Sequence, residues 1–275
     1  MCGGIDALRD FLLKNPERDP DDLHDALLVA TRKGTFPIFQ LMLDCAGASL
    51  KHSQALTAAT YYGFEDRFDR LLPRSNPHDS ERMALKVAAE LGHLHLVKKL
   101  VPVSTAEQCN SAFLCAARAG KVNITKYLLP FAGPSLYPRV LFEASEINCV
   151  EIIDLILPHY TFHPDHLLFA RGCFKEAARQ GHLDSVRRLL PFMDEEGIRG
   201  ALYSSSFGGH RDAVDFLYPL VNARTVLGRM ERDQCSPERT HLLRERLATE
   251  DTKKLLWDNL QTHYDESSGR PKNKM

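Results

Sequence analysis

Residues 173–191 read CFKEAARQGHLDSVRRLLP, and the pattern in this short stretch decides the fold. It begins with small and apolar residues, passes through one glycine, Gly181, and continues with apolar residues spaced as on one face of a helix. It ends at Pro191, which cannot extend a helix because proline lacks a backbone N–H and clashes with the preceding turn. The stretch therefore predicts a helix, a glycine corner and a second helix that stops at the proline.

The same pattern recurs along the chain in seven units, whose corner residues are Gly34, Gly63, Gly92, Gly120, Asn148, Gly181 and Gly209. Successive corners are 28 or 29 residues apart, except for the 33 residues that separate Asn148 from Gly181. A left-handed corner needs glycine, and asparagine is the next most tolerant residue. The single exception at position 148 therefore favours a conformational requirement over a chance spacing of glycines.

Each unit is expected to contain two packed helices. Small residues such as Ala88 and Ala89 precede the corners and let neighbouring helices approach closely. The best-formed units carry apolar residues two, five, eight and nine positions after the corner, which form one buried stripe on a helix of about ten residues. A proline ten positions after the corner should stop the second helix in six units: Pro73, Pro102, Pro130, Pro158, Pro191 and Pro219.

Four of these units share a longer phrase: AAELGHLHLVKKLV from residue 88, AARAGKVNITKYLL from 116, AARQGHLDSVRRLL from 177 and SSFGGHRDAVDFLY from 205. They resemble the A-A-x-x-G-H-x-x-V-x-x-L-L core of ankyrin repeats, over residues 20–220. The family period is about 33 residues, most units here are shorter, and the T-P-L-H opening is missing. The residues lost are those that would form the projecting β-hairpin. The resemblance implies an all-α solenoid of seven helix-turn-helix ankyrin-like repeats, with capping helices at both ends.

The shortened repeats favour longer first helices and few or no strands. Ser80, Thr105 and Asp194 are the expected helix starts, because their side-chain oxygens can accept hydrogen bonds from the first turn. We predict an N-terminal capping helix in residues 1–19, the repeat array in 20–220, a C-terminal helical cap in 221–264 and a disordered tail in 265–275. The C-terminal cap should contain one helix beginning after Ser236 and a second over Thr252–His263, with Trp257 covering the end of the stack.

Composition argues against several classes of protein. The chain has 275 residues and balances 35 basic against 36 acidic side chains, so nothing favours nucleic acid as a partner. Its seven cysteines are odd in number and form no C-x-x-C, which argues against a disulfide framework or a zinc ribbon. No secretory signal and no apolar run of about 18 residues is present. We therefore expect a monomeric cytoplasmic protein without a membrane span, located in the host cytoplasm if it is an effector.

The sequence contains no recognised catalytic or phosphate-binding motif, so we expect no enzyme activity and no cofactor. His93, His182 and His210 each directly follow a corner. We interpret them as residues that stabilise the fold, because an imidazole at that position can bond to the loop backbone. The alternative is an enzyme or metal-binding protein with a site in residues 159–173, where His159, His163 and His166 accompany Asp165 in the one long interval. Glu143 and Glu176 occupy the same repeat position as Cys115, and we expect either a rim pair or a buried acid pair with raised pKa values.

Partner contacts are expected on the first helices, which line the inner curve of such stacks. Residues two and six positions before each corner are four apart and share a helix face. This face is rich in aromatic, apolar and arginine side chains, the composition of interface hot spots. The predicted partner-binding residues are Tyr61, Tyr62, Leu114, Arg118, Phe142, Arg179, Tyr203 and Phe207. The function expected is a non-enzymatic protein–protein interaction module: an adaptor, an inhibitor or an effector in host interaction. Two alternatives are tighter packing that buries some of these side chains, and docking through the helices after Ser236.

Overall fold

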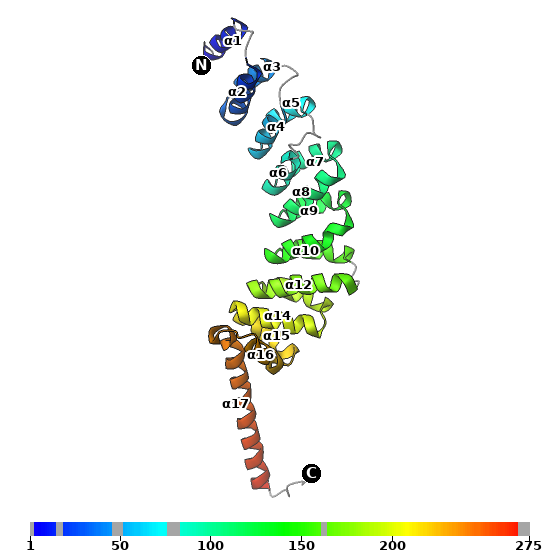
Figure 1. The fold of residues 1–275 in the computed structure, drawn as a ribbon, viewed down its shortest axis with the longest axis vertical. Coiled ribbons are helices and arrows are strands. Elements are labelled where there is room, and N and C mark those ends of the chain that lie inside the picture. Colours follow the sequence, from blue (N-terminus) through cyan, green and yellow to red (C-terminus); the bar gives the residue numbers. More distant parts are fainter. Residues whose placement is uncertain (1–2, 15–18, 46–51, 76–82, 161–163, 269–275) are drawn as a thin grey trace. The chain divides into compact units, whose positions relative to one another are not determined.

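The computed structural model describes residues 3–14, 19–45, 52–75, 83–160 and 164–268 (Figure 1). Within these ranges the chain forms seventeen α-helices and seven short 3-10 segments, and no strand. The predicted all-α class is confirmed. None of the described helices combines the length and the apolar composition that a membrane span needs. The chain divides into two compact units, residues 1–140 and 141–275, and the boundary falls inside helix α10 (Tyr137–Glu146).

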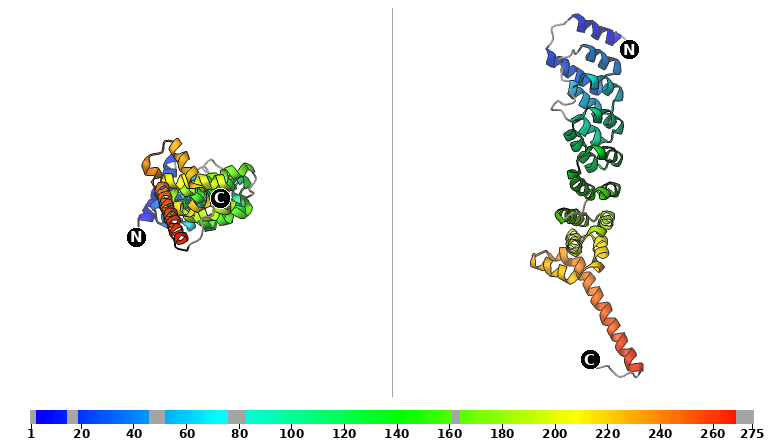
Figure 2. Two further views of the ribbon diagram at one scale, coloured as in Figure 1. Left: turned by 90° about the horizontal axis from the view of Figure 1, so that it is seen from below. Right: turned by 90° about the vertical axis from the view of Figure 1, so that its right-hand side faces the viewer.

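Unit 1 consists of paired helices in two layers (Figures 1 and 2). The first helices α2, α4, α6 and α8 contact one another in turn, and each also contacts its second helix, α3, α5, α7 or α9. The N-terminal helix α1 packs against α3. The bounds are α1 (Gly3–Lys14), α2 (Pro20–Lys33), α3 (Phe36–Cys45), α4 (His52–Tyr61), α5 (Glu65–Leu71), α6 (Met83–Leu91), α7 (Leu94–Leu100), α8 (Ala106–Arg118) and α9 (Val122–Leu128).

Unit 2 repeats this arrangement and adds two helices after it. First helix α14 lies between α12 and α16, and second helix α13 lies between α11 and α15. The last helix, α17, packs against α14, α15 and α16. The bounds are α11 (Val150–Ile156), α12 (Pro164–Gln180), α13 (Leu183–Leu189), α14 (Glu195–Gly208), α15 (Arg211–Leu217), α16 (Ala223–Arg232) and α17 (Pro237–Ser268). The long interval before Gly181 contains the 17-residue helix α12, so a longer first helix takes up much of it.

Six of the seven predicted corners are left-handed. The backbone φ angle is positive at Gly63, Gly92, Gly120, Asn148, Gly181 and Gly209. At every one of them the next residue donates its N–H to the carbonyl four residues before the corner, as from His93 to Ala88 O at 2.9 Å and from His182 to Ala177 O at 2.9 Å. This bond is the mark of a Schellman ending, which satisfies a carbonyl that the helix leaves unpaired.

The prediction of a left-handed corner is wrong at Gly34, where φ is −70° and ψ is 158°. There the arginine side chain of Arg67, from α5, satisfies the end of α2 instead. Its guanidinium donates to Ala30 O at 3.2 Å, to Gly34 O at 2.6 Å and to Thr31 O. With these carbonyls satisfied by a side chain, the left-handed turn is not needed.

The second helices end as the prolines predict. α5, α7, α9, α11, α13 and α15 each have seven residues, followed by a three-residue 3-10 segment with proline in the middle. Proline has no N–H to donate to the carbonyl four residues back, so the α-helical ladder stops there. A tighter bond closes the turn, as from Ser104 N to Val101 O at 3.1 Å. α3 has no proline ten positions after its corner, and the residues that follow its last residue, Cys45, lie outside the described residues.

The core is built from the small residues before the corners and the inner face of the second helices. Ala88, Ala89, Ala177 and Ala178 are all completely buried, as their predicted role in close helix packing requires. The buried stripe of the second helices differs in part from the prediction. In five of the seven repeats the position four residues after the corner is buried, for example at Leu96, whereas the predicted position two residues after it is half-buried or exposed.

The helix starts agree with the predictions where the structure describes them. Thr105 accepts from the N–H of Gln108, whose side chain accepts in return from Thr105 N at 2.8 Å, a complete capping box. Asp194 accepts from Gly197 N at 3.0 Å. Ser80 lies outside the described residues.

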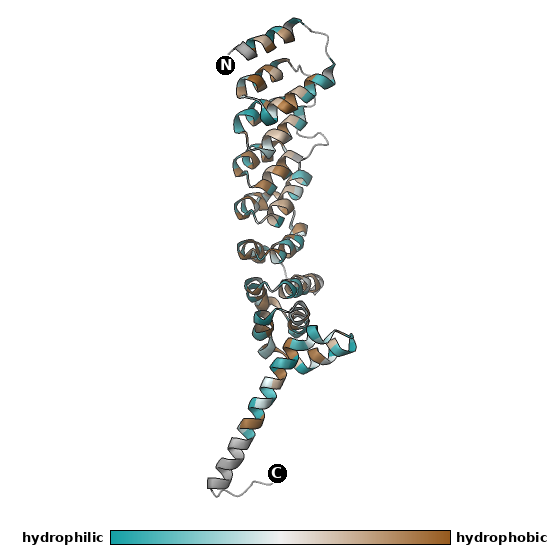
Figure 3. Ribbon diagram, turned by 90° about the vertical axis from the view of Figure 1, so that its left-hand side faces the viewer, coloured by the Kyte–Doolittle hydropathy of each residue, from teal (hydrophilic) through white to brown (hydrophobic). Residues whose placement is uncertain are grey.

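The C-terminal helices differ from the prediction. One continuous helix, α17, begins at Pro237 and replaces the two predicted helices. Its first half packs through Leu243 and Leu247, while Leu255, Leu256 and Trp257 are exposed, Trp257 by 68%. Trp257 therefore does not cover the end of the stack. Figure 3 shows both hydrophilic and hydrophobic residues in the coloured part of α17. The predicted disordered tail overlaps the helix up to Ser268, and residues 269–275 lie outside the described residues.

Candidate interaction surface

The positions two and six residues before each corner all lie outside the core. We call this set the first-helix face. In every repeat the position six residues before the corner is half-buried. The position two residues before it is exposed in all repeats except the last, where Phe207 is half-buried. The first-helix face thus has a half-buried row of side chains and, beside it, a mostly exposed row.

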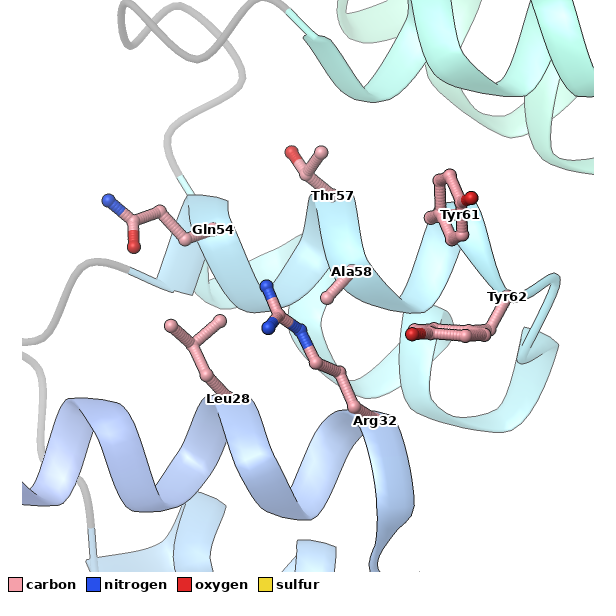
Figure 4. A pocket seen from close by; sticks show the side chains of 7 residues that line it. All are labelled: Leu28, Arg32, Gln54, Thr57, Ala58, Tyr61 and Tyr62. Carbon is pink, nitrogen blue, oxygen red and sulfur yellow. The ribbon is translucent and has the colours of Figure 1, made fainter.

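In unit 1 the first-helix face contains a groove of about 530 Å³ between α2 and α4. Figure 4 shows Leu28 and Arg32 projecting from α2 toward α4, and the rings of Tyr61 and Tyr62 at one end of the opening. The lining residues, which we call the first-helix groove, are Leu28, Arg32, Gln54, Thr57, Ala58, Tyr61 and Tyr62. The lining thus combines apolar and aromatic walls with a single cation.

The two tyrosine rings of the groove are exposed yet held in place. Tyr61 is 57% and Tyr62 48% exposed, and the two rings meet edge to face at 5.1 Å between centroids. Tyr62 in turn stacks on Phe64 at 5.6 Å, and the Arg67 guanidinium lies 4.3 Å from the Phe64 ring centroid. These ring contacts restrict the rotation of both tyrosines, so binding through them costs less conformational entropy than binding through side chains without such contacts.

Arg32 is the unpaired cation of the groove. Among the residues that the structure describes, it makes no hydrogen bond and no ion pair. An acidic or carbonyl group of a partner can therefore accept from Arg32 without displacing another acceptor. Leu28 and Arg32 are not among the predicted partner-binding residues, although they lie six and two positions before the corner residue Gly34.

Leu114 and Arg118 lie on α8 in the same unit, outside the first-helix groove. Leu114 is half-buried and Arg118 is exposed. On the intervening helix α6, the same face carries Lys86, Glu90 and Leu91. The predicted residues of unit 1 therefore do not form one cluster.

In unit 2 the predicted residues Tyr203 and Phe207 are covered in part by the C-terminal helices. Their rings stack at 6.4 Å, and the Arg239 guanidinium lies 3.8 Å from the centroid of Phe207. The Tyr203 hydroxyl lies 3.3 Å from Cys235 Sγ. This hydrogen bond is the main cause that raises the pKa of Tyr203, and burial of the side chain is the next. These two side chains are half-buried, and residues after the repeat array contact them, which differs from the alternative of tighter packing between shortened repeats.

The other predicted residues of unit 2 also have partners of their own. Arg179 donates to Glu176 through Nε at 2.9 Å, which holds the pKa of the Glu176 carboxyl below its usual value. The idea of a buried Glu176 with a raised pKa is therefore wrong. Phe142 contacts the exposed ring of Phe169 at 6.2 Å between centroids. Phe169 was not anticipated, because it precedes the recognisable part of its repeat.

The histidines that follow the corners pack against the preceding repeat. His182 Nδ1 lies 3.0 Å from Ser145 O, and the rings of His93 and His210 lie against Gly63 and Gly181. All three rings therefore contact the neighbouring repeat, which agrees with a role in stabilising the fold.

Several candidate ligands of the alternative metal site in residues 159–173 lie outside what the structure describes. His163 is not described, and the side chains of Asp165 and His166 are not described either. Among the described side chains no group of three potential metal ligands comes together. Cys173 is completely buried, and burial raises the pKa of its thiol to about 12, so the thiol is protonated at neutral pH. Cys115 is half-buried rather than buried.

Comparison of the sequence with protein-family models and with curated proteins finds no match.

Proposed function

We propose that the chain is a divergent, ankyrin-like repeat protein that binds a partner protein through the first-helix face. Three observations support the repeat assignment: the regular spacing of the seven corner positions, the six left-handed corners, and the pairing of helices in two layers within unit 1. Stacked repeats of this kind present a row of equivalent helices to solvent, and such rows serve as binding surfaces.

One observation carries the proposal: the first-helix groove in unit 1, where two tyrosines in mutual ring contact lie beside an unpaired arginine. Tyrosine and arginine are the side chains most enriched among the residues that dominate binding energy at interfaces. Buried apolar contact with the rings would supply affinity, and Arg32 would fix the orientation of an acceptor on the partner. The groove accordingly fits a partner side chain or short peptide segment with one apolar anchor and one acceptor.

The test uses a double variant of the groove, Arg32→Ala with Tyr61→Ala. Both side chains are exposed, so the free energy of unfolding should change by less than about 0.5 kcal/mol for each substitution. Affinity capture from cells that express the protein, followed by mass spectrometry, should recover a partner with the wild-type chain and lose it with the variant.

A matched control removes one arginine and one aromatic ring elsewhere in unit 1. Arg70 on α5 and Phe131 after α9 are both exposed and belong to the second-helix layer. The Arg70→Ala and Phe131→Ala double variant should retain the partner. If the groove variant and the control retain the same partners, the first-helix groove is not the binding site.

A further inference from the structure

A second groove lies in unit 2, between α14 and α16, and its chemistry differs from that of the first-helix groove. It has a volume of about 260 Å³ and contains three arginines, Arg199, Arg229 and Arg232. The remaining lining is Glu196, Tyr203, Thr225 and Val226. We call this the arginine groove.

The single acid in the lining does not neutralise the arginines. Glu196 Oε2 accepts from Arg171, on α12, at 2.9 Å. Of the three arginines, Arg232 has no hydrogen bond or ion pair among the described residues. Within the lining, three guanidinium groups therefore face one carboxylate, and that carboxylate already accepts from Arg171.

The other two arginines have weak partners. Arg199 Nη1 lies 3.5 Å from Glu195 Oε1, and Arg229 Nε lies 3.9 Å from Asp233 Oδ2. All four side chains are exposed. Ion pairs of this kind contribute little to stability because water competes for both groups. Both arginines can therefore turn to a stronger acceptor at small cost.

Other polar groups at the groove are already satisfied. The Asn222 side chain accepts from Arg224 N at 3.1 Å and from Thr225 N at 3.4 Å, so the amides that begin α16 are capped. The Tyr203 hydroxyl is occupied by Cys235, while its ring lies 5.7 Å from the Arg229 guanidinium. The groove thus offers guanidinium donors beside an aromatic wall, and few other donors.

From this arrangement we propose that the arginine groove binds a phosphorylated side chain of a partner peptide. A carboxylate ligand would replace Glu195 or Asp233 with a group of the same kind and gain little. A phosphate monoester carries a charge of about −2 and three acceptor oxygens, so it can accept from two or three guanidinium groups at once. The inference rests on the proposed function, because α14 is one of the first helices that would contact a partner.

The test uses fluorescent degenerate dodecapeptide pools that are identical except for the central residue: phosphoserine, serine or glutamate. Fluorescence anisotropy with the full chain should show at least tenfold tighter binding of the phosphoserine pool than of either other pool. The Arg229→Gln and Arg232→Gln double variant should lose this preference.

The matched control is the Arg187→Gln and Arg188→Gln double variant, which removes the same charge from the exposed face of α13 and should keep the preference. Equal binding of the glutamate and phosphoserine pools, or equal loss in both variants, would overturn the inference. So would a single-stranded RNA oligonucleotide that competes as strongly as the phosphoserine pool. These outcomes leave the proposed function untouched when the Arg32→Ala and Tyr61→Ala variant still loses its partner, so the two failures are distinguishable.

Discussion

Single corner residues serve the fold in two separable ways. Each left-handed corner needs a residue that tolerates a positive φ, and several also need empty space where a side chain would begin. A Cβ atom on Gly181 would lie 2.4 Å from the His210 ring, whereas a Cβ on Gly209 would meet nothing within 4 Å. Both glycines have nearly the same φ, +76° and +77°. This pair therefore separates backbone strain from packing.

Alanine at these two corners should have unequal costs. Both substitutions place alanine in the left-handed region, which costs about 1–2 kcal/mol of stability. Gly181→Ala should cost about 1–3 kcal/mol more, because the His210 ring must move. Urea unfolding followed by circular dichroism measures the difference. Adding His210→Ala to Gly181→Ala should reduce the gap, and equal costs at the two corners would show that the ring does not constrain Gly181.

Asn148 shows what the sequence can and cannot predict at this scale. Its tolerance of a left-handed backbone was predictable from residue type, and φ is 55°. Its second role was not: Asn148 Oδ1 accepts from the backbone N–H of Ser185 at 3.1 Å and from the Ser185 hydroxyl at 2.8 Å. The partner lies 37 residues away in sequence, so only the packed repeat brings the two residues together.

At the scale of the element, features that local chemistry determines were predictable, and features that a distant residue determines were not. The prolines after the second helices act on their own backbone, so the helix ends could be predicted. Gly34 could not, because Arg67 satisfies the end of α2 from another helix. The merged helix α17 has a different cause. After Pro237 no glycine or proline occurs before Gly269, so nothing in the sequence stops that helix.

The part of α17 after Thr252 should contribute little to the stability of unit 2, because residues 251–258 are exposed. Truncation after Thr252 keeps the hydrogen bonds of Glu250 to Tyr218 and of Asp251 to Arg224. The unfolding midpoint should therefore stay near that of the full chain. Leu243→Ala should instead cost about 2–5 kcal/mol, because Leu243 is fully buried. A truncation as costly as Leu243→Ala would mean that the exposed turns of α17 pack against something.

For the whole molecule, the sequence predicted an interaction surface more uniform than the one the structure has. Tyr61 and Tyr62 are open, but Tyr203 and Phe207 occupy the equivalent face of α14 beneath Arg239 and the Cys235 segment. A pattern confined to one repeat cannot indicate what packs over it after the repeats end. The two grooves therefore differ in character: unit 1 offers exposed aromatic rings with one arginine, and unit 2 offers several arginines around one partly covered ring.

A stack of repeats should also respond to damage locally, because each repeat contacts only its neighbours and stability is close to a sum of nearest-neighbour terms. Within unit 1, α2 packs against α3 and α4, and α8 packs against α6 and α9. Leu27 is completely buried in α2, so Leu27→Ala should raise amide hydrogen exchange in α2, α3 and α4 while α8 and α9 keep most of their protection. Hydrogen exchange measured by mass spectrometry resolves these segments. A uniform rise across the unit would instead indicate one cooperative globule, and it would remove the main support for treating the first helices as equivalent modules that display a binding face.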